Sequence, residues 1–181
     1  MRIRPAAPDD APGIAEVARE AWHAAYDDLL GPGLVDDRVD GWYDVERLRE
    51  GLDAADHYVV AEVDSGGAGT EVVGYAAAST GVEGRPDDEA TLEAIYVRPD
   101  HWGEGVGSRL LERVAGSVAD TGIERLSAVV FADNEVGRAF YDRHGFAVRG
   151  GADRVPRRGV GRPGRLGARR RRRGGAHERF V

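Results

Sequence analysis

The stretch IYVRPDHWGEGVGSRLL, residues 95–111, decides how this sequence is interpreted. It begins within an apolar run over residues 91–97, which is typical of a β-strand and stops at Arg98 and Pro99. It ends inside Val106–Ala119, where apolar residues recur with the spacing of one helix face. The stretch therefore predicts a strand, a short turn rich in glycine, and a helix in direct succession.

Three alternate glycines, Gly103, Gly105 and Gly107, lie at the junction of this strand and helix. Glycine allows the backbone to turn with its N–H groups pointing inward, and it has no Cβ to block a ligand. The start of a helix adds partial positive charge. This combination favours a binding site for a phosphate or pyrophosphate group.

Other phosphate sites and several other chemistries are excluded by specific residues. A P-loop needs a lysine after its glycine, whereas all 25 basic residues here are arginine. A dinucleotide fingerprint belongs on the first strand of a parallel fold, but three strands precede this one without crossover helices. The five histidines show no metal-ligand spacing, and the absence of cysteine removes thiolate ligands and a cysteine nucleophile. We expect no metal site.

The order of expected elements indicates an α/β fold with a mixed sheet. Consecutive strands in the middle of the chain favour antiparallel pairing, and the helix Val106–Ala119 makes a right-handed crossover between two parallel strands. We expect helices on both faces of the sheet. The expected strands cover residues 2–5, 57–63, 71–79, 91–97 and 126–132, and the expected helices cover 11–30, 35–52, 106–119 and a last segment capped by Asp133 or Asn134.

A second motif lies downstream in the segment ADNEVGRAFYDRHGF, residues 132–146. Together with the strand, glycine turn and helix, it resembles the GNAT superfamily of N-acetyltransferases, whose second signature is N-x(6)-Y-x(3)-GF. The resemblance covers Arg2–Phe146 and implies an N-acetyltransferase domain over residues 1–149, with a mostly antiparallel sheet that splays at the cofactor site. One departure is Trp102, where the family usually has Arg or Gln.

The resemblance implies that acetyl-CoA is the co-substrate and that an amine attacks its thioester directly. The pantetheine arm would pair with the backbone of the strand end, and Asn134 would hydrogen-bond it. The pyrophosphate would lie on the loop that starts at Trp102. The implied cofactor-binding residues are Ile95, Tyr96, Val97, Trp102, Gly103, Glu104, Gly105, Val106, Gly107, Ser108 and Asn134.

The resemblance places Tyr141 as the general acid that protonates the leaving thiolate, although it would also suit packing beside Phe140. Glu93 is the candidate base. It lies two residues before Ile95, so we expect both side chains on one strand face, but an ordinary solvent-facing carboxylate fits equally well.

The segment Trp22–Leu34 is similar to acetyltransferases that act on small amines or peptides. Trp22, His23 and Tyr26 are therefore candidates for the acceptor pocket, with core packing as the alternative for Trp22. The expected acceptor is a primary amine of a small molecule or peptide. A non-catalytic acyl-CoA-binding module on the same fold remains the alternative function.

The chain has a formal net charge of −7, and its acidic residues lie almost entirely before residue 150. An acidic, lysine-free body favours adaptation to concentrated salt, although a GC-rich genome would also favour arginine. No apolar run approaches the roughly 20 residues of a membrane span, and the N-terminus has no signal-like apolar core. We expect a cytoplasmic protein, as a monomer or a homodimer.

Residues 150–181 form a tail rich in arginine and glycine, with an unbroken arginine run at Arg169–Arg173. Such a segment buries too little apolar surface to offset its ordering entropy, so two expected closing strands are not recognisable beyond Phe146, apart from short apolar traces at residues 146–148 and 179–181. The run could neutralise nucleic-acid phosphates, but it lacks interleaved aromatic residues and the body is acidic. The tail is either genuine or an out-of-frame reading of a GC-rich gene.

Overall fold

The computed structural model describes residues 1–53, 55, 57–66, 69–81, 86–148 and 177–180. Within this part of the chain, seven strands form one sheet in the order β1-β2-β3-β4-β5-β7-β6. Only β4 and β5 pair in parallel, and the other neighbours are antiparallel. The mixed sheet expected from the sequence is confirmed. The strands are β1 (Arg2–Pro5), β2 (Tyr58–Asp64), β3 (Thr70–Ser79), β4 (Glu89–Val97), β5 (Arg125–Val130), β6 (Ala147–Val148) and β7 (His177–Phe180).

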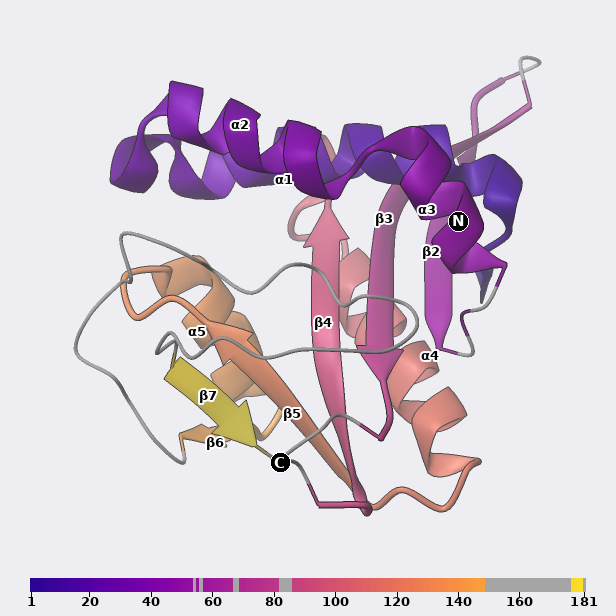
Figure 1. The fold of residues 1–181 in the computed structure, drawn as a ribbon, viewed down its shortest axis with the longest axis vertical. Helices are drawn as coiled ribbons and strands as arrows, with labels where there is room; N and C mark the ends of the chain where they lie inside the picture. Colours follow the sequence, from indigo (N-terminus) through magenta and orange to yellow (C-terminus); the bar gives the residue numbers. More distant parts are fainter. Residues whose placement is uncertain (54, 56, 67–68, 82–85, 149–176, 181) are drawn as a thin grey trace.

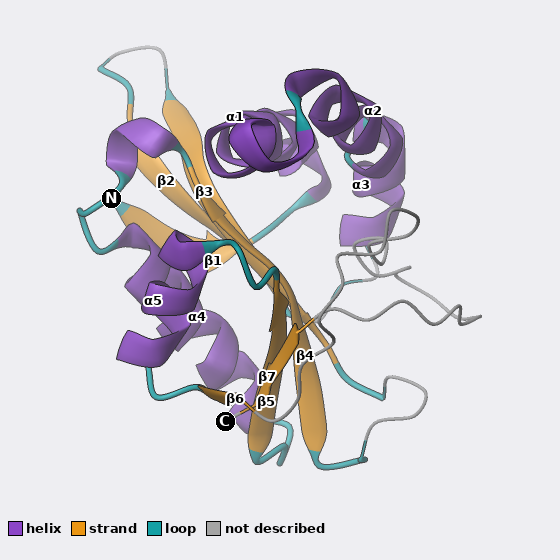
Figure 2. Ribbon diagram, turned by 90° about the vertical axis from the view of Figure 1, so that its left-hand side faces the viewer, coloured by secondary structure: helices purple, strands orange, loops and turns teal. Residues whose placement is uncertain are grey.

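The helices cover both faces of the sheet, as Figure 2 shows. One face carries α1 (Ala11–Leu30), α2 (Pro32–Trp42) and α3 (Val45–Leu52), which pack on a buried cluster that includes Tyr75 and Ala94. The other face carries α4 (Val106–Ala119) and α5 (Glu135–Arg143), whose core includes Leu92 and Leu110. Each face therefore has its own apolar core, and the sheet separates them.

The helical region before β2 differs in detail from the expectation. The helix predicted over residues 35–52 is two helices, because the chain leaves helical geometry at Tyr43 and Asp44 caps α3 through the N–H of Arg47. Asp10 occupies the N-cap position of α1, but its carboxylate makes no cap bond to that helix. Instead it accepts from both terminal nitrogens of Arg4, at 2.6 and 2.7 Å.

The pairing of β4 and β5 ends before β4 does. The last parallel partners are Leu92 and Ala128, whereas β4 stays paired with β3 as far as Val97. Figure 1 shows the two strands diverging toward their carboxyl ends. This divergence opens the sheet at the point where the glycine-rich turn begins.

The closing part of the sheet comes from two short strands. β7 pairs with β5 from Ser127 to Val130 and with β6 at residues 147–148. These strands lie at the apolar traces noted in the sequence. The proposed boundary at residue 149 and the run Arg169–Arg173 fall in residues 149–176, outside the described part of the chain.

Candidate active site

The glycine-rich turn presents the start of α4 to solvent. Gly105 is the N-cap and has a φ of 78°, a left-handed conformation that side chains disfavour. The first intrahelical bond of the helix runs from Arg109 N–H to the Gly105 carbonyl, so the N–H groups of the turn before it have no acceptor within the helix. Gly107 has a different role, because a Cβ there would lie 3.1 Å from the Phe140 ring. The loop is thus shaped for an anion and packed against α5.

Successive residues at the end of β4 direct their backbone N–H and C=O groups alternately toward β3 and away from it. The Arg98 N–H donates to the Val73 carbonyl, so Val97 and Gly74 form a non-hydrogen-bonded pair. The N–H and C=O groups of Val97, and by the same alternation those of Ile95, therefore point away from β3 and toward the opening beside β5. The backbone of Tyr96 points toward β3. Of the three residues expected to pair with the pantetheine arm, Ile95 presents both its N–H and its C=O on the correct side, whereas Val97 presents its N–H, because its carbonyl accepts from the Trp102 indole.

Trp102 reaches back to this strand. Its indole N–H donates to the Val97 carbonyl across 2.8 Å, while 45% of the residue is exposed. Beyond it, the Glu104 carboxylate lies 2.9 Å from Nδ1 of His101. Trp102 therefore supports the strand end rather than offering a cation to phosphate, and Glu104 adds a negative charge to the loop.

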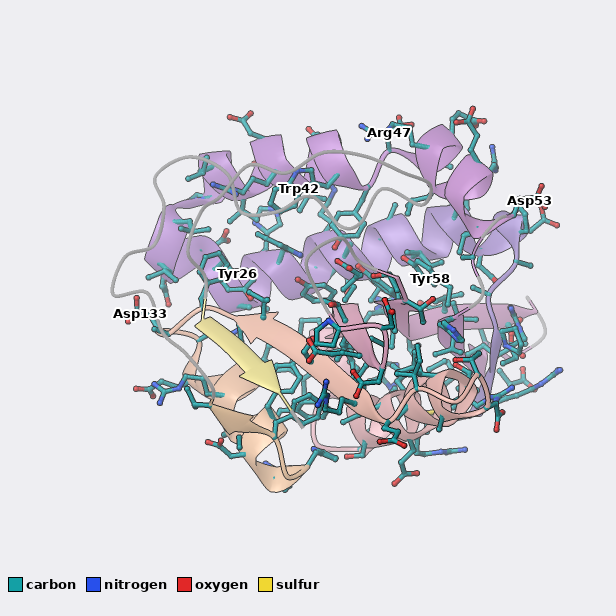
Figure 3. The ribbon with its side chains drawn as sticks, turned by 60° about the horizontal axis from the view of Figure 1, so that its bottom comes forward. Tyr26, Trp42, Arg47, Asp53, Tyr58 and Asp133 are labelled. Atoms are coloured by element: carbon teal, nitrogen blue, oxygen red, sulfur yellow. The ribbon has the colours of Figure 1, made fainter. Side chains whose placement is uncertain are left out.

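Of the two residues that the sequence offers as the N-cap of α5, Asp133 and Asn134, it is Asn134 that occupies this position. Its side-chain oxygen accepts from Gly137 N–H at 2.8 Å, and its nitrogen donates to the Tyr26 hydroxyl at 3.0 Å. An amide nitrogen has two hydrogens, so a second remains for a ligand. Tyr26 also packs against Phe131, the residue after β5, with ring centroids 5.3 Å apart. Figure 3 labels Tyr26 where α1 approaches the end of β5.

Tyr141 is buried on the α4 side of the sheet and packs against both Phe140 and Phe146. Burial raises the pKa of its phenol well above 10, and the nearby Tyr26 raises it further. Burial also raises the pKa of Tyr96, and the phenols of Tyr26 and Tyr141 contribute to that increase. Because burial raises the pKa of Tyr26 as well, all three tyrosines carry their protons at neutral pH.

Glu93 does not share a face with Ile95, which corrects the expectation. The register between β3 and β4 shifts there, with Ala77 opposite Ala94 but Ala78 opposite Leu92, so Glu93 is the extra residue of a β-bulge. Leu92 and Ile95 both pack on the α4 side. The Glu93 carboxylate instead accepts from the Ser79 hydroxyl on the face covered by α1. A bulge cannot be read from strand alternation, because it depends on the partner strand.

The candidate residues for the acceptor pocket lie in different environments. Trp22 is 3% exposed, and its ring lies 4.7 Å from Tyr26 and 5.2 Å from Trp42, so it belongs to the core. His23 lies at the surface of α1, where its ring nitrogens contact Asp27 at 2.9 Å and Asp36 at 3.2 Å. Of these three, Tyr26 is the one that bonds to Asn134, a candidate cofactor-binding residue.

One residue near the loop escaped the sequence analysis. His144, one of the five histidines without metal-ligand spacing, bonds through Nε2 to the Ser108 hydroxyl at 2.9 Å. The motif itself gave no signal, because His144 occupies an unspecified position between Tyr141 and Gly145. Spacing alone could not identify its partner on another helix.

Comparison with known proteins identifies the family of this chain. The sequence profile described as the Acetyltransferase (GNAT) family matches residues 17–146. The chain therefore belongs to this family and is an acyl-CoA-dependent acetyltransferase. An uncharacterized N-acetyltransferase of Mycobacterium tuberculosis is 26% identical over 141 residues, which is 78% of this chain and 85% of that protein.

Solved structures share the fold. The PaiA N-acetyltransferase of Thermoplasma acidophilum, in complex with coenzyme A, aligns with a TM-score of 0.77 and 20% identity, covering 99% of this chain and 96% of that one. A ribosomal-protein-alanine N-acetyltransferase of Brucella melitensis aligns with a TM-score of 0.68 and 21% identity, covering 100% of this chain and 99% of that one. At these identities the likeness concerns the fold.

Two features are absent from the residues that the structure describes. Within them, no cluster of His, Cys, Asp and Glu side chains has an arrangement that would hold a metal ion. Over the same ranges, no helix combines the length and apolar character needed to cross a bilayer.

Proposed function

We propose that this chain transfers the acetyl group of acetyl-CoA directly to a primary amine of a small molecule or peptide. The observation that carries the proposal is the opening between β4 and β5. There the outward backbone edge of Ile95 and Val97 lies next to the glycine loop and α5. An extended amide-containing arm fits such an edge as an added strand. The coenzyme A bound to the similar Thermoplasma protein supports the same assignment.

In this proposal the loop from Trp102 to Ser108 holds the pyrophosphate through backbone N–H groups. Gly105 permits the turn, and the start of α4 contributes partial positive charge. The second amide hydrogen of Asn134 bonds the arm, while its first stays on Tyr26. Because the side chain is fixed at both ends, binding costs little rotamer entropy.

Tyr141 acts as the general acid. A thiol has a pKa of about 8.5 and a free phenol about 10, and burial raises the pKa of Tyr141 further. Complete proton transfer to the thiolate is therefore uphill. The phenol instead donates a hydrogen bond that strengthens as negative charge develops on sulfur. The phenol proton passes to sulfur as the amine nitrogen loses a proton.

Glu93 is the proposed base, acting from the α1 side of the sheet. Its carboxylate accepts from Ser79, which keeps it oriented. The free energy needed to deprotonate the attacking amine depends on the acceptor. Freeing a lysine-like amine at pH 7 costs about 4.6 kcal/mol, whereas an α-amine costs about 1.4 kcal/mol. A partly exposed carboxylate suits the second class better, which favours amines of low pKa such as peptide α-amines.

The proposed setting is a cytoplasm of high salt. At about 1 M salt the Debye length is roughly 3 Å, so the acidic body would not repel an anionic cofactor over longer distances. The local N–H donors of the loop then decide binding.

A turnover screen tests the proposal. Acetyl-CoA is incubated in high salt with peptides, aliphatic amines and aminoglycosides, and both CoA release and acetylated product are measured. Product from at least one amine class, with loss of turnover in Glu93→Gln but retention in Glu112→Gln on the surface of α4, is the expected result. Tight acetyl-CoA binding without any amine-dependent product would contradict it and favour a non-catalytic acyl-CoA-binding module.

A further inference from the structure

His144 is hydrogen-bonded at both ring nitrogens. Nδ1 lies 2.8 Å from the Phe140 carbonyl oxygen, and Nε2 lies 2.9 Å from the Ser108 hydroxyl oxygen. The ring also packs on the Phe140 ring, with centroids 4.4 Å apart. The imidazole is therefore held in one orientation between α5 and the first turn of α4.

These contacts fix the direction of each hydrogen bond. A carbonyl oxygen only accepts, so Nδ1 carries the hydrogen of the neutral ring. Nε2 then has only a lone pair, and Ser108 must donate to it. Because a serine hydroxyl has a single hydrogen, Ser108 directs that hydrogen inward, toward His144.

This direction is unfavourable for a phosphate ligand. Ser108 lies in the first turn of α4, where the proposed function places the cofactor pyrophosphate. Phosphate oxygens accept hydrogen bonds, and a hydroxyl already donating elsewhere offers them only lone pairs. If Nε2 gains a proton, it becomes the donor to Ser108, and the hydroxyl hydrogen is free to turn outward.

We propose that His144 is a positioning residue that sets the direction of the Ser108 hydroxyl, so that the cofactor pyrophosphate binds with uptake of one proton at His144. The inference rests on the proposed function. A proton from solvent bonds to Nε2, the Ser108 O–H rotates to a phosphate oxygen, and no covalent bond of the cofactor changes.

The surroundings of His144 are compatible with a cation. It follows the last turn of α5, where peptide carbonyls give partial negative charge. The charged residues that precede it on α5 are Asp142 and Arg143. On α4, Arg109 follows Ser108 directly, and Glu112 lies one turn beyond Ser108 on the same helix side. On the loop, His101 is already bonded to Glu104.

Calorimetry with dephospho-CoA tests the proposal, because this ligand keeps the pyrophosphate but lacks the 3′-phosphate that titrates near neutrality. Binding is measured at pH 7 in two buffers of different ionisation enthalpy, which gives the number of protons taken up. The wild type is expected to take up a measurable fraction of one proton. Its affinity is expected to fall roughly tenfold from pH 6 to pH 8.5, the effect of one charge-assisted hydrogen bond.

Three variants test whether the proton uptake depends on the bond between His144 and the Ser108 hydroxyl. His144→Gln and Ser108→Ala should both abolish proton uptake and flatten the pH dependence, while Ser108→Thr, which keeps the hydroxyl, should retain both. His57→Gln is the matched histidine control and should behave as the wild type, because His57 bonds to the Ser117 hydroxyl at the other end of α4, 3.1 Å away. Thermal unfolding of each variant confirms that it is folded.

The outcomes are distinct. Proton uptake that persists in Ser108→Ala or His144→Gln, or that is absent from the wild type although dephospho-CoA binds, overturns the inference alone. Failure of the wild type to bind either dephospho-CoA or acetyl-CoA would instead overturn the proposed function.

Discussion

The side-chain nitrogen of Asn134 donates to the phenol oxygen of Tyr26 across 3.0 Å, which joins the cap of α5 to α1 over 108 residues of sequence. The bond lies just beyond the carboxyl end of β5, where Tyr26 also packs against Phe131. It therefore links α1, the helix that would face the acceptor, with Asn134, the residue proposed to hold the pantetheine arm.

Removing only the Tyr26 hydroxyl should weaken cofactor binding. Tyr26→Phe keeps the ring contacts with Trp22 and Phe131 but leaves the Asn134 amide unfixed. We expect acetyl-CoA affinity to fall about fivefold, the effect of one net hydrogen bond, with a small change in Tm. Asn134→Ser keeps an N-cap oxygen but has no amide donor, so it should lose more affinity at similar stability. Wild-type affinity in both variants, measured by calorimetry, would show that the pair is only structural.

Tyr141→Phe should lower kcat while leaving acetyl-CoA affinity nearly unchanged, because only proton donation to sulfur is lost. General acid catalysis typically contributes about 10²-fold or more. Burial raises the pKa of Tyr141, so the group stays protonated as pH rises, and wild-type kcat should show no alkaline loss from this residue below pH 10. Steady-state kinetics and separate binding measurements distinguish the two effects. An unchanged kcat would reduce Tyr141 to a packing residue.

Glu104 places a carboxylate on the proposed pyrophosphate loop, 2.9 Å from the His101 ring. Glu104→Gln should tighten acetyl-CoA binding several-fold at low ionic strength, since like charges a few ångströms apart in water repel by about 1 kcal/mol. At about 1 M salt the gain should vanish through screening. Asp120→Asn makes the same charge change at the far end of α4 and should have little effect. A gain of equal size in both variants would point to overall charge rather than to the loop.

Arg4 and Asp10 connect β1 to the start of α1. Burial alone would raise the pKa of Asp10, but hydrogen bonds from Arg4 and from the Ala7 N–H prevail and lower it. A carboxyl with a lowered folded-state pKa stabilises the fold above its unfolded-state value and loses that stabilisation as pH falls through the folded-state value. Asp10→Asn should therefore reduce the free energy of unfolding by roughly 1–3 kcal/mol at pH 5–7, and the difference from wild type should shrink below pH 4.

Chemical denaturation at several pH values measures this difference. Asp9→Asn is the matched control, because Asp9 is exposed next to Asp10. A difference that stays constant from pH 7 to pH 3 would show that the lowered pKa does not contribute.

The sequence by itself determined the features that depend on neighbouring residues. The strand, glycine turn and helix over residues 95–111 were recognisable because helical periodicity and the need for glycine at positive φ are local properties. The long helix α1, the cap at Asn134 and the mixed sheet followed from the same kind of signal.

The tertiary structure alone decided which side chains meet. Glu93 lies on the α1 side because a bulge forms against β3, and no pattern within β4 encodes its partner's register. The bonds from Asn134 to Tyr26 and from His144 to Ser108 join separate helices. Each of these bonds depends on how the two cores pack against the sheet. This packing sets the distances between residues far apart in the chain, and local propensity carries no information about it.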